Sequence, residues 1–516
     1  MRSLTRRQTL QGMAGAVAAL ALPKAIAVRG QETAPPVDLV RFAWGTDVGA
    51  PTPFQISPAG PGGPVLLSLL YDTLTWKDAE GIVPWLATDW TVTDDGLGYT
   101  FRLVENATWH DERPLTAEDV AFSFDYYARH PYPWMGTEVV ASSEVVDRGT
   151  VRIALKRPYA AFIEDIAGVV PIVPRHVWEP VADPIAYDGR DRFVGSGPFR
   201  LEEYDQTAAA YRLLANDRYW RGRPRVREWR QITAPAEAQL RVVQQGEADL
   251  SFGTDASVVD LLAGDPRLRV FATAPHSIVR LAVNTARPPL DRKEVRQAIA
   301  YALDRQQIAE TITRGPAIVG SAGVVPPETP WHNPALPAYG FDPDQARELL
   351  GGESLTLGLI ADANARDPDL MAPMLEEVGI TLDVQRVDGP TRIALLDEGD
   401  FDLALVTHIG VGGDPDFLRR WYAGEEANAF AKGSIFANAE YAALGEEQAA
   451  TLDADARRAI VFRMQAILAE ELPTIALYHR RFFWVHDPAV FTPLETWGGL
   501  LNGVPFPNNK LTLIEG

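Results

Sequence analysis

The chain has 516 residues, 46% of them hydrophobic and 23% charged, so it is ordinary globular material and long enough for two or more domains. Its formal net charge of −21 argues against nucleic acid as a partner, because there is no excess of cations to neutralise phosphates. The absence of cysteine from the sequence excludes disulfides and thiolate metal sites.

The N-terminus carries the elements of a signal peptide in the usual order. Arg6-Arg7 precedes the apolar run 12–22, and Ala25-Ile26-Ala27 has the small-x-small pattern of a cleavage site. These elements predict a signal peptide over residues 1–27, and the paired arginines favour the twin-arginine route. The run is too short for a stable membrane span, and no cysteine follows it to carry a lipid anchor. We therefore expect an exported, periplasmic protein that is soluble after cleavage.

Residues 71–190 have the pattern of a small α+β unit. Residues 99–110 alternate as in a half-exposed antiparallel strand, and residues 151–156 predict a second strand. Between them, residues 116–130 predict an amphipathic helix that Thr116 caps. Pro-rich joins separate these elements, which is typical of an insertion into a larger domain.

A first α/β unit follows. Strands are predicted over residues 226–232 and 248–252, with a helix over residues 236–245 between them. A helical segment then covers residues 291–312, where Asp291 can cap and Glu294 stands three positions later, as in a capping box.

A second α/β unit lies beyond a further helix that Asp342-Pro343 opens. Its predicted strands are 355–360, 380–387 and 401–406, and its predicted helices are 369–378 and 391–398. Strands that alternate with helices of this length predict βαβ units. We therefore expect two separate α/β units, each on a mostly parallel sheet.

The two units share a repeated stretch. The segments 240-LRVVQQGEADLSF-252 and 393-IALLDEGDFDLAL-405 match position by position, with Gly246 equivalent to Gly399 and an Asp-Leu pair three positions later in each. Each segment predicts the last turns of a helix, a glycine in the left-handed conformation and a short buried strand. One chain thus builds the same helix–turn–strand element twice.

Four runs resemble the bacterial extracellular solute-binding proteins of the oligopeptide/dipeptide/nickel class, family 5. They are residues 95–127, 194–204, 219–224 and 283–308, and the likeness extends from about residue 38 to the C-terminus. The resemblance implies a two-lobed periplasmic-binding-protein fold of type II, in which two crossing strands join two α/β lobes and a small α+β domain is inserted in the first lobe. The implied boundaries are 38–70, 191–274 and 481–516 for lobe I, 71–190 for the inserted domain and 275–480 for the opposite lobe.

The same resemblance implies a transport function. A peptide or peptide-like solute is captured between the lobes and delivered to an ABC permease in the inner membrane, and the chain itself has no G-x-x-x-x-G-K-[ST] motif for ATP. Two alternatives stay open: a non-peptide ligand (oligosaccharide, opine-like compound or metal chelate), and a sensor that docks on a chemoreceptor. We expect a monomer without cofactor, without metal and without enzymatic activity.

The stretch 407–422 follows directly on a predicted strand and is expected to reach the cleft. In peptide-binding relatives the corresponding stretch has an aromatic residue, then an acidic residue that pairs with the peptide amino group. Here His408 stands at the aromatic position and Val411 at the acidic one, so the carboxylate is missing. Either Asp414 replaces it or the ligand has no free amine there; Asp414 is equally explained as a turn residue before proline. Gly410 either forms a flexible turn or lets backbone amides approach a ligand.

Further candidates come from positions where family members contribute ligand contacts, and for each of them packing is the competing explanation. They are Trp44, Gly62, Tyr132, Trp134, Arg280, Tyr478 and Trp497, with Arg280 as a partner for a ligand carboxylate.

An enzymatic function lacks sequence support. Gly195-Ser196-Gly197 does not have the spacing of the nucleophile elbow, and no H-E-x-x-H motif occurs. His110-Asp111-Glu112 cannot converge on one metal ion, because neighbours on an extended segment point to alternate sides. A pair of carboxylates acting as in glycosidases stays open at this point, since only their separation in space would identify it.

Overall fold

The computed structural model describes residues 35–57, 62–253, 257–262, 264–275, 277–315, 317–423, 436–501, 503–504 and 506–514. The signal peptide predicted over residues 1–27 lies outside the described residues. The described strands form sheets of seven, six, four and two strands.

The seven-stranded sheet is the centre of one body, which we call lobe I. Its strands are β1 (Val37–Trp44), β8 (Phe199–Asp205), β9 (Ala210–Ala215), β10 (Val226–Thr233), β11 (Leu250–Gly253), β12 (Arg269–Ala272) and β19 (Phe483–His486). They lie in the order β12-β19-β11-β1-β10-β9-β8. The helices α1 (Gly62–Leu70), α4 (Ala236–Gln244) and α5 (Ser257–Leu262) belong to the same body.

The six-stranded sheet is the centre of the opposite lobe. Its strands are β13 (Ser277–Val283), β14 (Ile318–Val319), β15 (Leu355–Asp362), β16 (Ile380–Val387), β17 (Leu403–Ile409) and β18 (Thr474–Arg480), in the order β14-β18-β13-β17-β15-β16. Its helices are α6 (Lys293–Ala302), α7 (Arg305–Thr313), α8 (Pro343–Leu350), α9 (Asp367–Glu377), α10 (Gly389–Glu398), α11 (Phe417–Tyr422), α13 (Ala439–Ala450) and α14 (Ala454–Glu471).

The expectation of mostly parallel sheets is wrong for both lobes. In lobe I, β1 runs parallel to its two neighbours β10 and β11, and the remaining pairings are antiparallel. In the opposite lobe, β15 likewise runs parallel to β16 and β17, and antiparallel strands complete the sheet. The βαβ pattern therefore predicted the parallel centre of each sheet. Strands from distant parts of the chain, such as β18 and β19, pair with the rest of each sheet in the antiparallel direction.

The repeated helix–turn–strand element is present in both lobes. Gly246 follows α4 with a φ of 75°, and Gly399 follows α10 with a φ of 68°. A residue with a Cβ is strained in this region, so glycine lets each helix end and the chain enter the next strand at once.

The aspartate of each repeat ties its strand to the parallel centre of the sheet. Asp249, just before β11, accepts the backbone N–H of Arg41 in β1 at 2.8 Å. Asp402, just before β17, accepts the backbone N–H of Gly358 in β15 at 2.8 Å. The two lobes thus use the repeat in the same way.

The helical segment between the units differs from the prediction in two respects. α6 begins after Arg292, whose side chain makes no cap, so the capping box expected from Asp291 is wrong. Asp291 instead belongs to the preceding turn, where its N–H donates to Arg287. The segment is also broken, because Leu303 is extended and Asp304 caps the new helix α7 by accepting the N–H of Gln307 at 2.9 Å.

The inserted domain has an antiparallel sheet of β4 (Ala87–Val92), β5 (Gly98–Leu103), β6 (Val140–Asp147) and β7 (Thr150–Leu155), in the order β4-β5-β7-β6. It also contains the helices α2 (Ala117–Tyr127) and α3 (Arg175–Trp178). The strand expected over residues 99–110 ends at Leu103, and Thr116 precedes α2 as predicted. The remaining elements are β2 (Thr75–Lys77), β3 (Ile82–Pro84) and the single turns Phe162–Ile166, Arg190–Phe193 and Lys510–Leu513.

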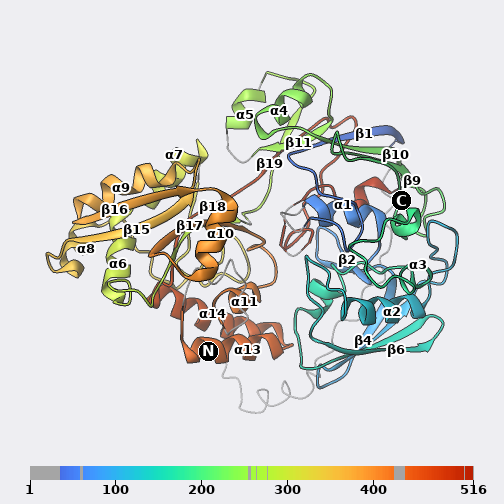
Figure 1. Cartoon of the computed structure of the whole chain (residues 1–516), viewed down its shortest axis with the longest axis horizontal. Helices are drawn as coiled ribbons and strands as arrows, with labels where there is room; N and C mark the ends of the chain where they lie inside the picture. Colours follow the sequence, from blue (N-terminus) through green and yellow to red (C-terminus); the bar gives the residue numbers. More distant parts are fainter. Residues whose placement is uncertain are drawn as a thin grey trace, which may run out of the picture.

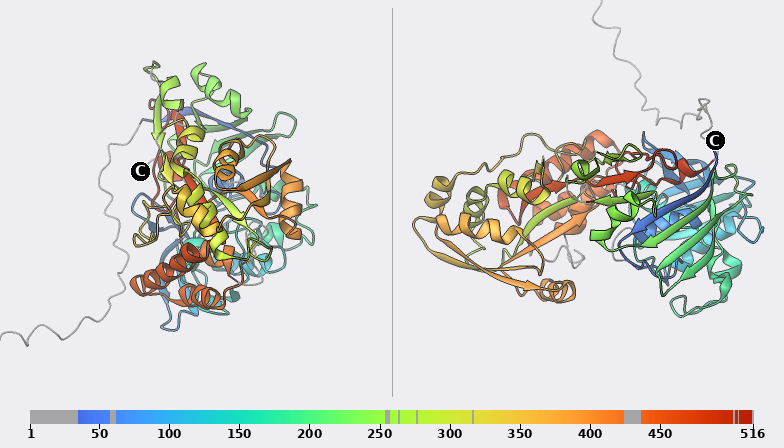
Figure 2. Two further views of the ribbon diagram at one scale, coloured as in Figure 1. Left: turned by 90° about the vertical axis from the view of Figure 1, so that its left-hand side faces the viewer. Right: turned by 90° about the horizontal axis from the view of Figure 1, so that it is seen from above.

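Two segments connect lobe I with the opposite lobe, one between β12 and β13 and one between β18 and β19. Both cross at the top of the molecule in Figure 1, and the view from above in Figure 2 shows the two lobes side by side along the longest axis. One apolar core runs through lobe I and the inserted domain, and a separate core fills the opposite lobe. The two bodies are thus linked along the chain by two short connections, an arrangement that permits them to move relative to each other.

A buried ion pair holds the C-terminal segment on lobe I. Lys510 Nζ lies 2.9 Å from Asp72 Oδ1, and neither side chain is exposed to solvent. The ammonium also lies 4.1 Å from the ring centroid of Trp76 and 4.6 Å from that of Trp85, whose Nε1–H donates to Asp72. Burial lowers the pKa of Lys510, which the Asp72 carboxylate opposes. This contact fixes the segment that forms one wall of the cavity described next.

Candidate functional site

A cavity of about 440 Å³ lies between the two lobes. Lobe I contributes the end of β12 and the C-terminal segment 494–499, and the opposite lobe contributes residues 328–331 and the loop 412–413 after β17. The connection between β12 and β13, residues 273–275, forms a further part of the wall. A solute in this cavity would therefore contact both lobes and one of their connections.

Two tryptophans from different lobes line the cavity. Trp497, on the C-terminal segment of lobe I, is 46% exposed, and its backbone N–H donates to the carbonyl of Asp78. Trp331, from the opposite lobe, has the guanidinium carbons of Arg457 and Arg458 at 5.4 and 5.5 Å from its ring centroid. Aromatic rings of this kind offer apolar contact area and a face that attracts cations.

Two of the described residues that line the cavity are charged, and both are acidic. They are Glu328 and Glu495, and the described lining residues include no Lys, Arg or His. Glu328 forms an ion pair with Arg481 at 2.5 Å. Glu495 accepts the backbone N–H of Ala274, within the β12–β13 connection, at 2.8 Å.

Glycine loops from the two lobes touch beside the cavity. A Cβ atom on Gly503 would lie 2.4 Å from the carbonyl oxygen of Gly410, and one on Gly413 would lie 2.8 Å from the Cα of Gly503. Gly410 and Gly503 have φ values of 90° and 74°. Gly410 thus lies close to backbone of lobe I, and the approach of its amides to a ligand stays a prediction.

The first part of the stretch 407–422 packs into the opposite lobe. His408 is buried, and its ring lies edge-on to that of Trp421, with centroids 4.3 Å apart. Burial, together with the nearby Arg280 guanidinium, holds the pKa of His408 well below its usual range. Val411 is 1% exposed and belongs to an apolar cluster with Phe417 and Leu418.

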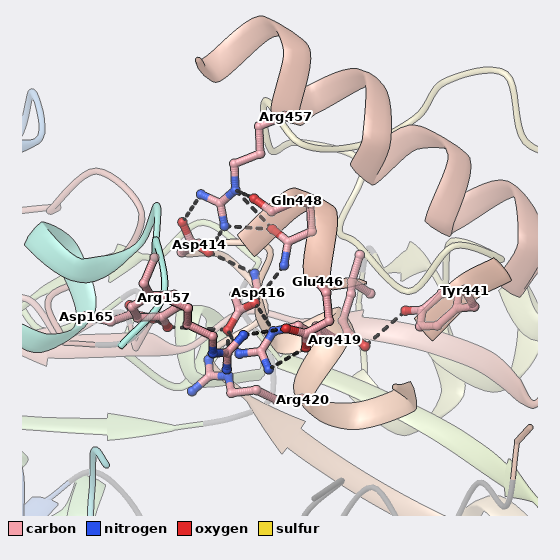
Figure 3. Close-up of polar contacts among 12 residues, drawn as sticks. Arg157, Asp165, Asp414, Asp416, Arg419, Arg420, Tyr441, Glu446, Gln448 and Arg457 are labelled. Atoms are coloured by element: carbon pink, nitrogen blue, oxygen red, sulfur yellow. Dashed lines mark hydrogen bonds and ion pairs between the residues drawn. The ribbon is translucent and has the colours of Figure 1, made fainter. Parts of the chain in front are cut away.

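The carboxylates of the same stretch are bound by arginines. Arg457 donates to both oxygens of Asp414, at 2.6 and 2.7 Å (Figure 3). Arg419 donates to both oxygens of Asp416, each at 2.7 Å. Gln448 donates to Asp416 at 2.6 Å and accepts from Arg457, so one network joins the loop to α13 and α14.

The network reaches across to the inserted domain, a contact that we call the clasp. The Tyr159 hydroxyl lies 3.0 Å from Asp165 and 3.3 Å from Asp416. Arg157 pairs with Glu446 of α13 (Figure 3), and two backbones meet where Ala160 N–H donates to the Ala449 carbonyl at 2.7 Å. The clasp lies at the bottom of Figure 1, at the end of the inter-lobe face opposite to the two connections.

Asp165 is the least compensated carboxyl of the clasp. It is 1% exposed, and its Oδ1 has no hydrogen-bond partner among the described residues. Burial, and then the charge of Asp414, raise the pKa of Asp165 to about 7, although Arg420 opposes the shift. This carboxyl therefore titrates near neutral pH.

The other predicted residues lie away from the cavity wall. The ring of Trp44 packs on Gly62, where a Cβ would lie 2.5 Å from it, and stands 5.4 Å from that of the wall residue Phe506. Tyr132 is buried in the apolar core of the inserted domain, and Trp134 packs against that core.

Arg280 and Tyr478 are buried in the opposite lobe. The Arg280 guanidinium donates to the hydroxyl of Thr474 at 3.1 Å and lies 5.4 Å from the ring centroid of Trp421. Tyr478 donates its hydroxyl to Asp367 at 2.7 Å. Of the eleven predicted ligand residues, Trp497 is among the residues that line the cavity and the other ten are not, so their ligand roles stay predictions.

Most of the cavity wall was missed, including its two acidic residues, Glu328 and Glu495, and its second tryptophan, Trp331. The only signal for Glu495 was its place two positions before Trp497. No group of three or more His, Asp or Glu that could hold a metal ion occurs among the described residues. In the same part of the chain, every helix is too short or too polar to cross a bilayer.

Comparison with known proteins agrees with the two-lobed architecture. Heme-binding protein A of Haemophilus influenzae is 26% identical over 451 residues, which are 80% of this chain and 82% of that protein. A protein of Pseudomonas aeruginosa named probable di/tripeptide-binding protein 5 is 29% identical over 453 residues, 80% and 81% of the two chains. The crystal structure of NikA from Brucella suis in complex with Fe(III)-EDTA superposes with a TM-score of 0.76 at 22% identity and covers 91% of this chain and 99% of its own.

The fold predicted from the sequence, two α/β lobes with a small α+β domain inserted in the first, is confirmed by these structures. The model of the family described as bacterial extracellular solute-binding proteins, family 5 Middle, matches residues 81–430, which is more than half of the chain. The chain therefore belongs to the bacterial extracellular solute-binding proteins of family 5.

Proposed function

We propose that this chain is the solute-binding component of an ABC importer and that it captures a peptide or peptide-like solute between its lobes. The observation that carries the proposal is the cavity whose wall comes from both lobes and from the β12–β13 connection. A solute that contacts both walls binds the closed arrangement more tightly than the open one, so it shifts the population toward closure. The closed protein then delivers the solute to a permease in the inner membrane.

The relatives support a small organic cargo. One carries di/tripeptide-binding in its name, and another is a dipeptide-binding protein of Escherichia coli, 26% identical over 444 residues. Both names describe binding rather than turnover, and we propose that this chain also binds without chemical change. A monomer is sufficient, because both walls come from one chain.

We further propose the export route and the domain limits. Residues 1–27 direct the chain to the periplasm by the twin-arginine route and are then removed. Residues 38–70, 191–274 and 481–516 form lobe I, residues 71–190 the inserted domain and residues 275–480 the opposite lobe, limits that fall near the connections between β12 and β13 and between β18 and β19.

A second candidate is the same transport role with a non-peptide ligand. Val411 is buried in an apolar cluster and Asp414 is bound by Arg457, so the stretch 407–422 offers no carboxylate for a peptide amino group at these two positions. Named ligands of relatives include heme and an iron chelate as well as peptides. The experiment below separates the two candidates.

The test is a thermal-shift screen of the mature chain, residues 28–516, against di- and tripeptides, oligosaccharides, opine-like compounds and metal chelates. A ligand that binds only the native state raises the melting temperature, by an amount that corresponds to about 2.7 kcal/mol at a hundredfold excess over Kd. We expect peptides to give the shift, whereas a shift with sugars or chelates alone would select the second candidate. Mass spectrometry of each binding mixture should recover the ligand unchanged, and accumulating product would contradict the proposal.

A further inference from the structure

The charge of the cavity wall is uncompensated at one position. Glu328 is neutralised by Arg481, whereas Glu495 has the Ala274 N–H as its single polar contact among the described residues. Because no Lys, Arg or His occurs among the described lining residues, the cavity carries a net negative charge. An anionic ligand would be repelled from this site, and a cationic group would be attracted.

The acidic side chains on the opposite wall are already occupied. Asp414 binds Arg457 through both oxygens, and Asp416 binds Arg419 in the same way. Each of these carboxylates is nearly inaccessible to solvent, so replacing its arginine with a ligand would leave a buried guanidinium without its partner. The loop after β17 therefore has no carboxylate to offer to a ligand cation.

Glu495 is both anchored and accessible. Its Oε1 accepts the N–H of Ala274 at 2.8 Å, which fixes the carboxylate against the β12–β13 connection. The side chain is exposed, and its second oxygen has no hydrogen-bond partner among the described residues, so this oxygen can accept a further hydrogen bond. A carboxylate with one oxygen tethered to the backbone is oriented before the ligand arrives, which lowers the entropic cost of binding.

We propose that Glu495 binds the positively charged group of the ligand and that the cavity selects solutes with an ammonium or a similar cation next to an apolar part. This inference rests on the proposed function, since it concerns the same cavity. Trp331 and Trp497 supply the apolar contact, and the exposed ring of Trp497 adds attraction for the cation. The acidic group on which ligand recognition depends thus comes from the C-terminal segment of lobe I and not from the loop after β17.

The test measures charge selectivity in the wild-type chain and in Glu495→Gln. The glutamine keeps an oxygen for the Ala274 hydrogen bond and removes only the charge. Calorimetric titrations use tri-alanine, N-acetyl-tri-alanine and tri-alanine amide, which differ in the presence of the ammonium and of the carboxylate. We expect the wild type to bind tri-alanine and its amide at least tenfold more tightly than the acetylated peptide. Glu495→Gln should weaken binding of the two free amines about ten- to a hundredfold and leave the acetylated peptide unchanged.

Two control variants bracket the effect. Glu144→Gln removes the same charge from an exposed position on β6 and should bind all three peptides as the wild type does. Glu495→Asp keeps the charge and should retain part of the preference for the free amine. All variants should have nearly the same melting temperature without ligand, because Glu495 makes a single hydrogen bond to the described residues.

The outcomes separate this inference from the proposed function. Equal binding of free and acetylated peptide by the wild type, or unchanged binding in Glu495→Gln, would overturn the role of Glu495 and leave solute capture intact. If no tripeptide binds, the same pair of proteins is titrated with spermidine, glutarate and maltotriose. Binding of spermidine alone, lost in Glu495→Gln, would support the inference for a non-peptide amine; binding of glutarate or maltotriose would refute it. A wild-type chain that binds none of these compounds, nor any in the thermal-shift screen, would refute the proposed function itself.

Discussion

Gly413 and Gly503 meet backbone to backbone, and a Cβ atom on Gly413 would lie 2.8 Å from the Cα of Gly503. Gly413 belongs to the loop after β17 in the opposite lobe, and Gly503 belongs to the C-terminal segment packed on lobe I. Because no side chain separates these loops, the lobes approach each other more closely than any other pair of residues would permit.

Gly413→Ala should hold the lobes apart and weaken ligand binding. The added methyl group meets backbone atoms, which cannot move aside as a flexible side chain can, so the open arrangement gains population. The apparent Kd rises as the closed fraction falls, and we expect an increase of about tenfold. Small-angle scattering should show a larger radius of gyration, and titration with a ligand from the screen should show the loss of affinity. Gly340→Ala is the matched control, since no atom of the described residues, apart from Gly340 and its two chain neighbours, lies within 4 Å of the added carbon. Identical behaviour of the two variants would refute this role of Gly413.

Asp414→Asn should destabilise the protein without altering its choice of ligand. The substitution removes the charge that pairs with Arg457, and both side chains are only 6% exposed, so we expect a loss of about 3 kcal/mol in the free energy of unfolding. Denaturation with urea measures this loss. Asp455→Asn, which breaks an exposed pair with Arg458, should cost less than about 1 kcal/mol. The ratio of affinities for tri-alanine and N-acetyl-tri-alanine should stay that of the wild type; a collapse of this ratio would show that Asp414 contacts the ligand.

Ionisation of Asp165 should lower the stability of the native state between pH 4 and pH 7. Burial and the nearby Asp414 raise the pKa of Asp165 to about 7, whereas the unfolded chain has the ordinary value near 3.8. The native state therefore favours the protonated carboxyl, and it loses stability as the pH rises from about 4 to about 7 and ionises this group. Asp165→Asn should match the wild type near pH 4 and exceed it at pH 8 by up to a few kcal/mol.

Urea unfolding at several pH values checks the role of Asp165. Asp125→Asn, at an exposed position of α2, should follow the wild-type pH profile. A profile of Asp165→Asn parallel to that of the wild type would mean that another group causes the pH dependence.

Lys510→Met should be strongly destabilising. Methionine fills the space between Trp76 and Trp85 but leaves the Asp72 carboxylate buried without its cation, which costs about 3–5 kcal/mol. Lys293→Met breaks a more exposed pair with Glu470 and should cost less than about 1 kcal/mol. Guanidinium denaturation monitored by tryptophan fluorescence compares the two variants, and equal losses would contradict a special role for the buried pair.

The sequence was sufficient to predict features that depend on the conformational preferences of single residues. Gly246 and Gly399 were predicted to end helices with positive φ, and the structure confirms both. The prediction was possible because no other residue adopts that conformation at so low a cost in free energy. The equivalence of Asp249 and Asp402 was also visible. Their common role, binding the N–H of the central parallel strand, was not, since Arg41 lies 208 residues from Asp249.

Contacts between residues far apart in the sequence also explain the errors in the predicted sheets and in the candidate site. Antiparallel strands such as β19 come from the far end of the chain, and the hydrophobic periodicity of a strand does not show which strands it will pair with. Val411 stands at a ligand position of the family in the stretch 407–422, yet its side chain is buried in an apolar cluster that includes residues of α11. Asp414 is bound by Arg457, which lies 43 residues later in the sequence. Nothing in the sequence of the loop indicates that a residue of a distant helix will pair with its carboxylate.

The clasp between the inserted domain and the opposite lobe has a kinetic consequence. Arg157–Glu446 and the Ala160–Ala449 hydrogen bond join the two bodies at the end of the inter-lobe face remote from both connections, so parting of the lobes at this end must break these contacts. The escape rate of a trapped solute then depends in part on contacts that lie outside the cavity wall. The dwell time of cargo, and with it the chance of meeting a transporter while loaded, is set in part by residues outside the cavity.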